Sequence, residues 1–175
     1  MTSARVLIRP PEKGDTAEFL DAVAASRDLH HPWVFPAATT RAFHAYVRTR
    51  KRVDQFGVLV RTITDDRLVG VINVNNIVLG GMRSGALGYY AFADAAGKGL
   101  MADGMALVLD HAFASDGLAL HRLEANIQPG NLPSRRLVER LGFDLEGFSP
   151  KFLFIDGDWR DHDRWAITAD AWRRR

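Results

Sequence analysis

A glycine-rich loop between a strand and a helix limits most strongly what this chain can fold into. Gly97-Lys98-Gly99 follows a predicted strand, GALGYYAF, and opens a predicted helix over residues 100–114. The first N–H groups of a helix have no partner within it, and the positive end of its dipole lies there. The two glycines allow a ligand to approach the backbone, and Lys98 adds a positive charge. The pattern predicts an anion site. The helix is expected to bury Met101, Met105, Val108, Leu109, Ala112 and Phe113.

The loop differs from two other phosphate-binding motifs. Residues 97–102 fit the dinucleotide fingerprint G-x-G-x-x-A. That fingerprint belongs to the first strand of a repeated βαβ series, whereas predicted helices and antiparallel strands precede this loop. Lys98 is not followed by Ser or Thr, so the loop is not a Walker motif. An ordinary glycine turn before a core helix stays open as the alternative.

The pattern before the loop predicts a strand, two helices and a hairpin. A strand at 5–9 should end at Pro10-Pro11, and the acidic and hydroxyl residues at 15–18 provide a capping signal for the first helix. A second helix should follow Thr39-Thr40. Period-two alternation over 56–78, interrupted at Asp65-Asp66, predicts an antiparallel hairpin. The side chains expected to face inward from the helices are Phe19, Leu20, Val23, Phe43, Tyr46 and Val47.

The pattern after the loop adds three strands and one helix. RLEANI (122–127) reads as a strand, and 132–141 as a helix that Gly142 ends. Asp156-Gly157 predicts the turn between two final strands. The whole is an α+β arrangement, a mixed and mostly antiparallel sheet of about seven strands with about four helices. We expect one domain over residues 1–175.

The composition excludes several kinds of catalytic and metal site and indicates where in the cell the protein is found. The 175 residues include no cysteine, which excludes a disulfide scaffold, a thiolate nucleophile and a sulfur-based zinc site. No His, Asp and Glu cluster argues for a metal. The start lacks the apolar run of a signal peptide, and no stretch approaches the roughly 18 apolar residues of a membrane span. We therefore expect a cytoplasmic protein with no membrane association.

Basic residues gather at 48–52 and 173–175, although the formal net charge is only +2. Such clusters are most simply a solvated helix face and a charged terminus. Weak attraction of a polyanionic partner such as a ribosome is the alternative. This balance implies no direct requirement for nucleic acid.

Three segments carry a resemblance to a known family. AAGKGLMADGMALVLDHAF and LHRLEANIQPGNLPSRRLVERLGFDLEG resemble the acetyl-CoA core of the GCN5-related N-acetyltransferases (GNAT). IDGDWRDH resembles the ribosomal-protein alanine and serine N-acetyltransferases of the RimJ and RimL type. The resemblance implies the GNAT fold, with a sheet split at the acetyl-CoA cleft, and acetyl-CoA as the cosubstrate. It also implies an amine acceptor, most simply the α-amine at the N terminus of a ribosomal protein.

The resemblance also assigns the residues that would hold acetyl-CoA. The strand before the loop would lend backbone groups to the pantetheine arm, and the loop would wrap the pyrophosphate. Asp94 stands where family members often carry Gln or Arg, so Lys98 would compensate. Asn131 matches an asparagine that contacts the pantetheine arm, and it fits a helix N-cap equally well. The implied cofactor residues are Tyr89, Tyr90, Ala91, Phe92, Gly97, Lys98, Gly99, Leu100, Met101, Ala102 and Asn131.

Two residues match catalytic positions of the family. Ser134 matches a serine proposed to protonate the departing thiolate, and Val138 replaces the tyrosine that does so in many other relatives. Glu124 matches a glutamate that could act as the general base, on the same strand face as Arg122 and Asn126. A surface serine and an ion-paired glutamate are the alternatives.

The acceptor side is less defined. Trp33, which follows a proline, matches an element near the acceptor groove of RimJ-like proteins, and His30 could face the substrate. Trp159 is more simply a packed residue of the last hairpin. A small-molecule amine as acceptor, such as an antibiotic or a toxic aminoacyl compound, and a non-catalytic acyl-CoA-binding module are the alternative functions. The protein could be a monomer or a homodimer.

Overall fold

One mixed sheet contains all seven strands of the chain. The computed structural model describes residues 1–175. The strand order is β1-β2-β3-β4-β5-β7-β6, and only β4 and β5 run parallel to each other. This confirms the predicted mixed, mostly antiparallel sheet. The strands are β1 Val6–Arg9, β2 Phe56–Thr62, β3 Leu68–Val78, β4 Ser84–Ala91, β5 Arg122–Ile127, β6 Asp144–Ile155 and β7 Asp158–Thr168.

Six α-helices accompany the sheet, two more than the sequence predicts. The four predicted helices are present as α1, α3, α4 and α5, and the additional α2 and α6 have four and five residues. Helices this short contain too few residues to show a helical repeat of apolar positions. The helices are α1 Thr16–Ala25, α2 Arg27–His30, α3 Thr40–Thr49, α4 Leu100–Phe113, α5 Leu132–Arg140 and α6 Ala169–Arg173.

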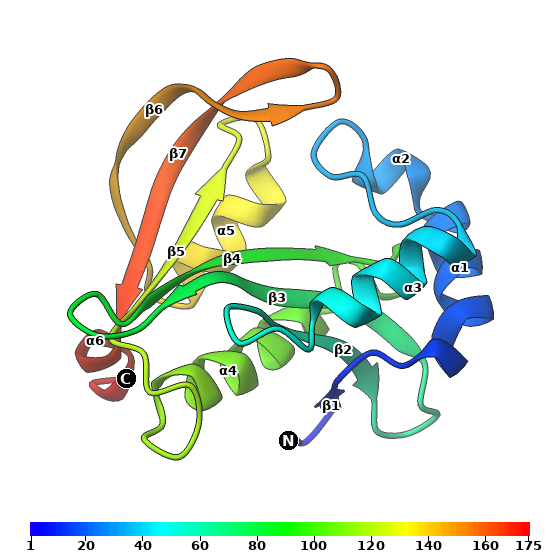
Figure 1. The fold of residues 1–175 in the computed structure, drawn as a ribbon, viewed down its shortest axis with the longest axis horizontal. Helices are drawn as coiled ribbons and strands as arrows, with labels where there is room; N and C mark the ends of the chain where they lie inside the picture. Colours follow the sequence, from blue (N-terminus) through cyan, green and yellow to red (C-terminus); the bar gives the residue numbers. More distant parts are fainter.

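The helices bury apolar side chains on both faces of the sheet (Figure 1). On one face, Phe19 of α1 and Phe43 of α3 pack with their ring centroids 4.3 Å apart. They belong to a cluster of eight buried residues that includes Phe92, which directly follows β4. On the other face, a cluster of 25 buried residues includes all six apolar positions predicted for α4. The two clusters hold β4 between them, so its end is a rigid part of the molecule.

The predicted capping signal of α1 is wrong in its details. Asp15 occupies the N-cap position, but its side chain makes no cap hydrogen bond to α1. The carboxylate instead pairs with the Arg9 guanidinium and accepts a hydrogen bond from the Glu12 N–H (2.7 Å). Two contacts with a guanidinium satisfy both oxygens of the carboxylate, which explains the change of partner.

The turn predictions at the two hairpins are confirmed. Asp156 and Gly157 have φ angles of 52° and 78°, as the turn between β6 and β7 requires. Asp66 lies in the turn between β2 and β3 with φ of 51°.

None of the helices has the length and apolar character that crossing a membrane demands.

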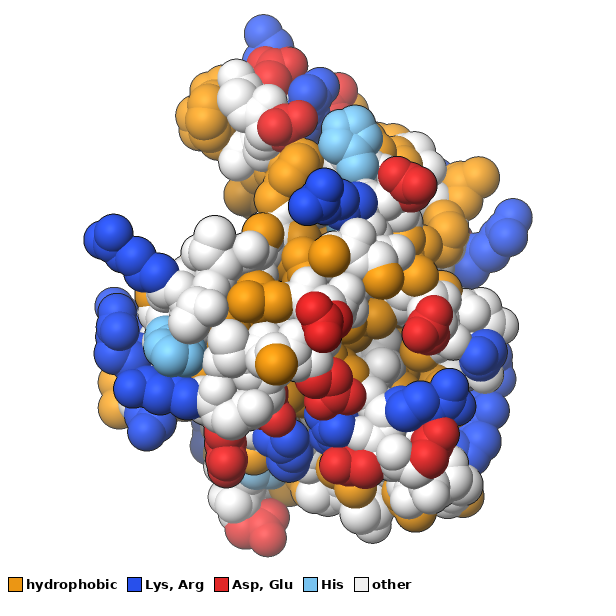
Figure 2. Space-filling model, turned by 90° about the vertical axis from the view of Figure 1, so that its right-hand side faces the viewer, with side chains coloured by type: hydrophobic (Ala, Val, Ile, Leu, Met, Phe, Trp, Pro, Cys, Tyr) orange, Lys and Arg blue, Asp and Glu red, His pale blue; other side chains and the backbone are white.

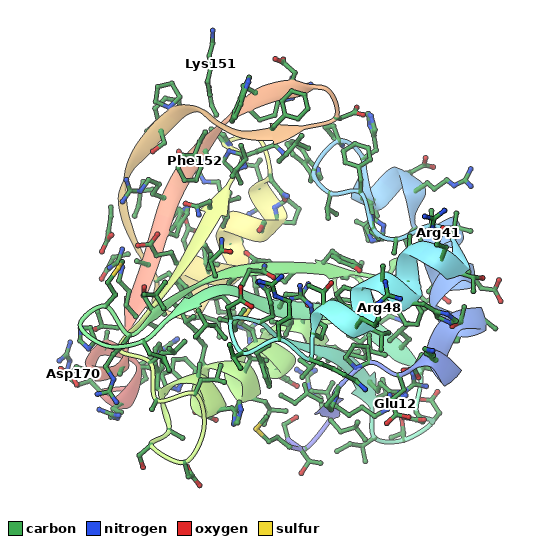
Figure 3. All side chains as sticks on the ribbon, in the orientation of Figure 1. Glu12, Arg41, Arg48, Lys151, Phe152 and Asp170 are labelled. Atoms are coloured by element: carbon green, nitrogen blue, oxygen red, sulfur yellow. The ribbon has the colours of Figure 1, made fainter.

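The face that carries α1, α2 and α3 is mixed in charge. Figure 2 shows Lys and Arg side chains along its margins and acidic side chains nearer its centre. Arg41 and Arg48 extend outward from α3, and neither forms an ion pair with a carboxylate (Figure 3). A solvated helix face is therefore the simplest description of this helix, and the attraction of a polyanion stays the alternative.

Candidate active site

The parallel strands β4 and β5 separate part-way along their length. They pair from Ser84 with Arg122 to Leu87 with Ala125, and the ladder stops there. β4 continues over residues 88–91, where it remains paired with β3 on its other edge. The edge of β4 that faces β5 is therefore left without a ladder partner over these residues, and its backbone groups other than the Ala91 carbonyl, which accepts a hydrogen bond from His30, are available to a ligand. The parting of the two strands confirms the expected split of the sheet.

Unpaired backbone donors lie beside this split, in the glycine loop. The N–H groups of residues 97–101 donate no hydrogen bond to any acceptor in the protein. Gly97 and Gly99 both have φ of 74°, a conformation that favours glycine, and Gly99 is the N-cap of α4 with no side-chain cap. A Cβ built on Gly97 meets nothing within 4 Å, so the space beside it is open. Such an arrangement fits a diphosphate at the start of α4.

Two cations stabilise the loop from its sides. Lys98 Nζ donates to the carbonyl of Asp94 (2.6 Å), so this side chain folds back over the loop. Arg5 pairs with Asp103 in the first turn of α4 (2.7 Å), and its Nη1 donates to the Lys98 carbonyl (3.3 Å). Sequence reasoning missed Arg5 because no spacing rule connects positions so far apart in the chain.

Tyr89 and Ser134 meet across the split. Asn131 is the N-cap of α5, where its Oδ1 accepts the Ser134 N–H (3.2 Å), which confirms the capping alternative for this residue. The Ser134 hydroxyl lies 2.6 Å from the Tyr89 phenol oxygen. Burial raises the pKa of Tyr89, so the phenol is neutral. The sequence predicted only backbone contacts for Tyr89 and gave no sign of this side-chain pair.

Glu124 lies close to the end of the β4–β5 ladder. It pairs with Ala86, one position before the last paired residues. Its carboxylate accepts a hydrogen bond from Arg122 Nε (2.9 Å), so the ion-paired alternative is confirmed. Arg122 also binds Glu146 of β6 through both terminal nitrogens. Further along the same face, Asn126 has a buried Oδ1 without a hydrogen-bond partner.

His30 is buried in the structure. Only 4% of the residue is exposed, and its Nε2 donates to the carbonyl of Ala91 at the end of β4 (2.8 Å). Burial lowers the pKa of His30, so the ring is neutral near pH 7. The ring also packs edge-on against Tyr90 and Phe92. A contact of His30 with substrate stays a prediction, and the geometry gives it a role in holding the end of β4.

A cavity of about 270 Å³ lies between three separate segments of the chain. Trp33 comes from the connection between α2 and α3, and its ring lies against Gly130 in the turn before α5. Trp159 and Asp161 come from the start of β7. Trp159 is 55% exposed, so its expected packing in the hairpin core is wrong. The hairpin of β6 and β7 projects beyond the body of the molecule (Figure 1), in agreement with the exposure of this indole.

A larger cavity of about 580 Å³ lies on the other side of the glycine loop. Asp94, Ala95, Lys98 and Leu100 line it together with residues of α1, β2 and β3. None of its lining residues comes from β5 or α5. It is therefore distinct from the split between β4 and β5.

A comparison of the sequence with protein-family models matches residues 5–144 to the acetyltransferase (GNAT) domain. The chain belongs to the GNAT family of acetyltransferases. A GNAT protein transfers an acetyl group from acetyl-CoA to an amine, so the chain is an acetyl-CoA-dependent N-acetyltransferase. The split in the sheet and the unpaired N–H groups of the loop fit this cosubstrate.

Individual relatives agree with membership of the GNAT family. A probable N-acetyltransferase of Bacillus subtilis, YjcK, is 33% identical over 93% of both chains. The [ribosomal protein uS5]-alanine N-acetyltransferase of Escherichia coli is 28% identical over 98% of this chain and 92% of its own length. The structure of Mycobacterium smegmatis RimJ in complex with CoA-disulfide has a TM-score of 0.85 and 29% identity, covering 94% of this chain and 82% of that one.

Proposed function

We propose that this GNAT enzyme acetylates the α-amine of a protein N terminus, that of a ribosomal protein. The similarity to a uS5-alanine N-acetyltransferase and to a RimJ structure supports this acceptor. Spermidine N-acetyltransferase from Vibrio cholerae shares the fold at 20% identity, and therefore gives no information on the acceptor of this chain.

The charge of the cavity between Trp33 and Trp159 is the observation that carries the proposal. Its lining includes one carboxylate, Asp161, and one guanidinium, Arg160. Asp161 already accepts a hydrogen bond from the Lys151 N–H (2.8 Å), while the Lys151 side chain points outward from the bend in β6 (Figure 3). A polyamine carries several positive charges, which several carboxylates would complement better than this one. A peptide end carries one ammonium and fits a lining without net charge.

Each part of the site then has a defined task. The N–H groups of residues 97–101 bind the diphosphate, and the free edge of residues 88–91 binds the pantetheine amides. Glu124 takes the proton of the acceptor amine directly or through one water. Ser134 acts as the hydroxyl donor to the leaving sulfur of CoA. Asn131 acts on the pantetheine arm through its capping of α5.

The acidity of the acceptor also favours a protein N terminus. A free α-amine has a pKa of about 8, against about 10.4 for a lysine side chain. A larger fraction of the α-amine is therefore neutral at pH 7, and a carboxylate acting through water is a sufficient base.

A panel of acceptors tests the proposal directly. Steady-state release of CoA would be measured with peptides that begin with Ala or Ser, with the same peptides blocked at the N terminus, with polyamines and with aminoglycosides. We expect turnover with the free peptides only. Turnover confined to the small amines would reject the protein acceptor, and CoA binding without turnover on any amine would indicate a non-catalytic module.

Replacing Trp33 with alanine should weaken acceptor binding selectively. Loss of a large aromatic contact at an interface of this kind should raise the KM of the best peptide by roughly tenfold. The KM of acetyl-CoA should not change, because Trp33 lies outside the glycine loop. Phe35→Ala is the matched control, since Phe35 lies in the same connection but does not line the cavity. An equal rise in peptide KM for both variants would contradict a specific contact with Trp33.

A further inference from the structure

A hydrogen bond between side chains joins β4 to α5 across the split. Tyr89 lies two residues beyond Leu87, the last residue of β4 that pairs with β5. Its phenol oxygen is 2.6 Å from Ser134 Oγ. Resting on the proposed transfer from acetyl-CoA, we propose that Tyr89 is a positioning residue, which directs the hydroxyl proton of Ser134 toward the sulfur of CoA.

Either hydroxyl can donate in this contact, and we assign the hydrogen to Tyr89. Burial keeps the phenol protonated by raising its pKa, so Tyr89 has one hydrogen to donate. Ser134 Oγ lies at 2.6 Å, whereas the Ser134 carbonyl lies at 3.4 Å. The shorter contact is the better acceptor for the phenol. With Tyr89 as donor, the Ser134 hydroxyl proton has no other acceptor in the protein, and it is free for a ligand.

The serine is held in place by more than this one contact. Its N–H donates to Asn131 Oδ1, and it lies in the first turn of α5. The backbone and the hydroxyl of Ser134 are therefore both fixed. This reduces the conformational entropy that is lost when the hydroxyl binds a ligand. Asn131 sets the position of the serine, and Tyr89 sets the rotation of its hydroxyl.

The leaving group of the reaction is a thiolate, which a hydrogen-bond donor can stabilise. The acceptor nitrogen bonds to the acetyl carbon, the carbon–sulfur bond breaks, and the electron pair stays on sulfur. The proton released by the amine goes to Glu124 or to water. A hydroxyl is a weaker acid than a thiol, so Ser134 retains its proton and stabilises the thiolate by a charge-assisted hydrogen bond. This differs from the expected full proton transfer from the serine.

The thiol of bound CoA provides a direct test, because a hydrogen-bond donor beside sulfur lowers the pKa of that thiol. The ultraviolet absorbance of the thiolate would be titrated with pH for CoA bound to the wild type, Tyr89→Phe, Ser134→Ala and the double variant. We expect the highest thiol pKa in Ser134→Ala, an intermediate value in Tyr89→Phe, and no further change in the double variant. The kcat should fall roughly ten- to a hundredfold in Ser134→Ala, and less in Tyr89→Phe.

Tyr46→Phe controls for the loss of a buried phenol, because Tyr46 donates to Asn73 Oδ1 (2.8 Å) beneath α3. It should leave the thiol pKa unchanged. Two results would overturn the proposal. In the first, the thiol of CoA bound to Tyr89→Phe has the same pKa as in the wild type. In the second, the effects of the two substitutions on the thiol pKa add in the double variant. The thiol titration needs no acceptor. A failure of every peptide in the acceptor panel would therefore reject the proposed acceptor without affecting this result.

Discussion

Gly97→Glu is expected to abolish measurable binding of acetyl-CoA, with a rise in Kd of at least about a hundredfold. Two unit charges 4 Å apart repel by about 4 kcal/mol at the effective dielectric of a protein surface, and about 1.4 kcal/mol corresponds to a factor of ten. The new carboxylate would lie in the open space beside the unpaired N–H groups, where the diphosphate is expected. Isothermal titration calorimetry with CoA measures the change.

Two further variants separate charge from backbone strain. Gly97→Gln has the same shape and the same strained φ without the charge, and it should weaken binding far less than glutamate. Gly80→Glu introduces the same charge at another glycine with positive φ (69°), in the turn between β3 and β4. This variant should bind CoA normally. Near-normal affinity of Gly97→Glu would show that the diphosphate does not bind at this loop.

The strong local patterns made much of the fold predictable. The strand at 122–127, the helix after the glycine loop and the Asp156-Gly157 turn all depend on neighbouring residues, and the structure has each of them where it was expected. Periodicity in sequence reports directly on which face of an element is buried. The glycine loop was predictable for the same reason, since its conformation and its position before a helix are both local.

The missed features are contacts between different elements of the fold. Asp15 pairs with Arg9 of β1 and does not cap α1, and Tyr89 of β4 contacts Ser134 of α5. Trp159 was expected to pack, but the hairpin projects from the body and leaves the indole exposed. Each of these features depends on how complete helices and strands pack together. The spacing of residues in the sequence does not predict that packing.

Glu124→Gln should lower kcat/KM for the best peptide by about a hundredfold to ten-thousandfold, the usual range for loss of a general base. The glutamine keeps the size of the side chain and can still accept a hydrogen bond from Arg122. It cannot take up the proton of the acceptor. The loss should be largest below pH of about 8, where the α-amine is mostly protonated, and should shrink above it as the amine becomes neutral unaided. A rate profile from pH 6 to about pH 9.5 measures this dependence.

Glu146→Gln is the matched control, because Glu146 binds the same Arg122 from β6. The two carboxylates are similarly exposed, at 35% for Glu124 and 40% for Glu146. Each variant removes one charged partner of Arg122 and leaves the other in place, so an effect through Arg122 would be similar in both. A large loss in Glu124→Gln alone would therefore arise from the position of Glu124 beside the split. Equal losses would assign both residues to stabilising β5 and β6, and the base would then be water or another group.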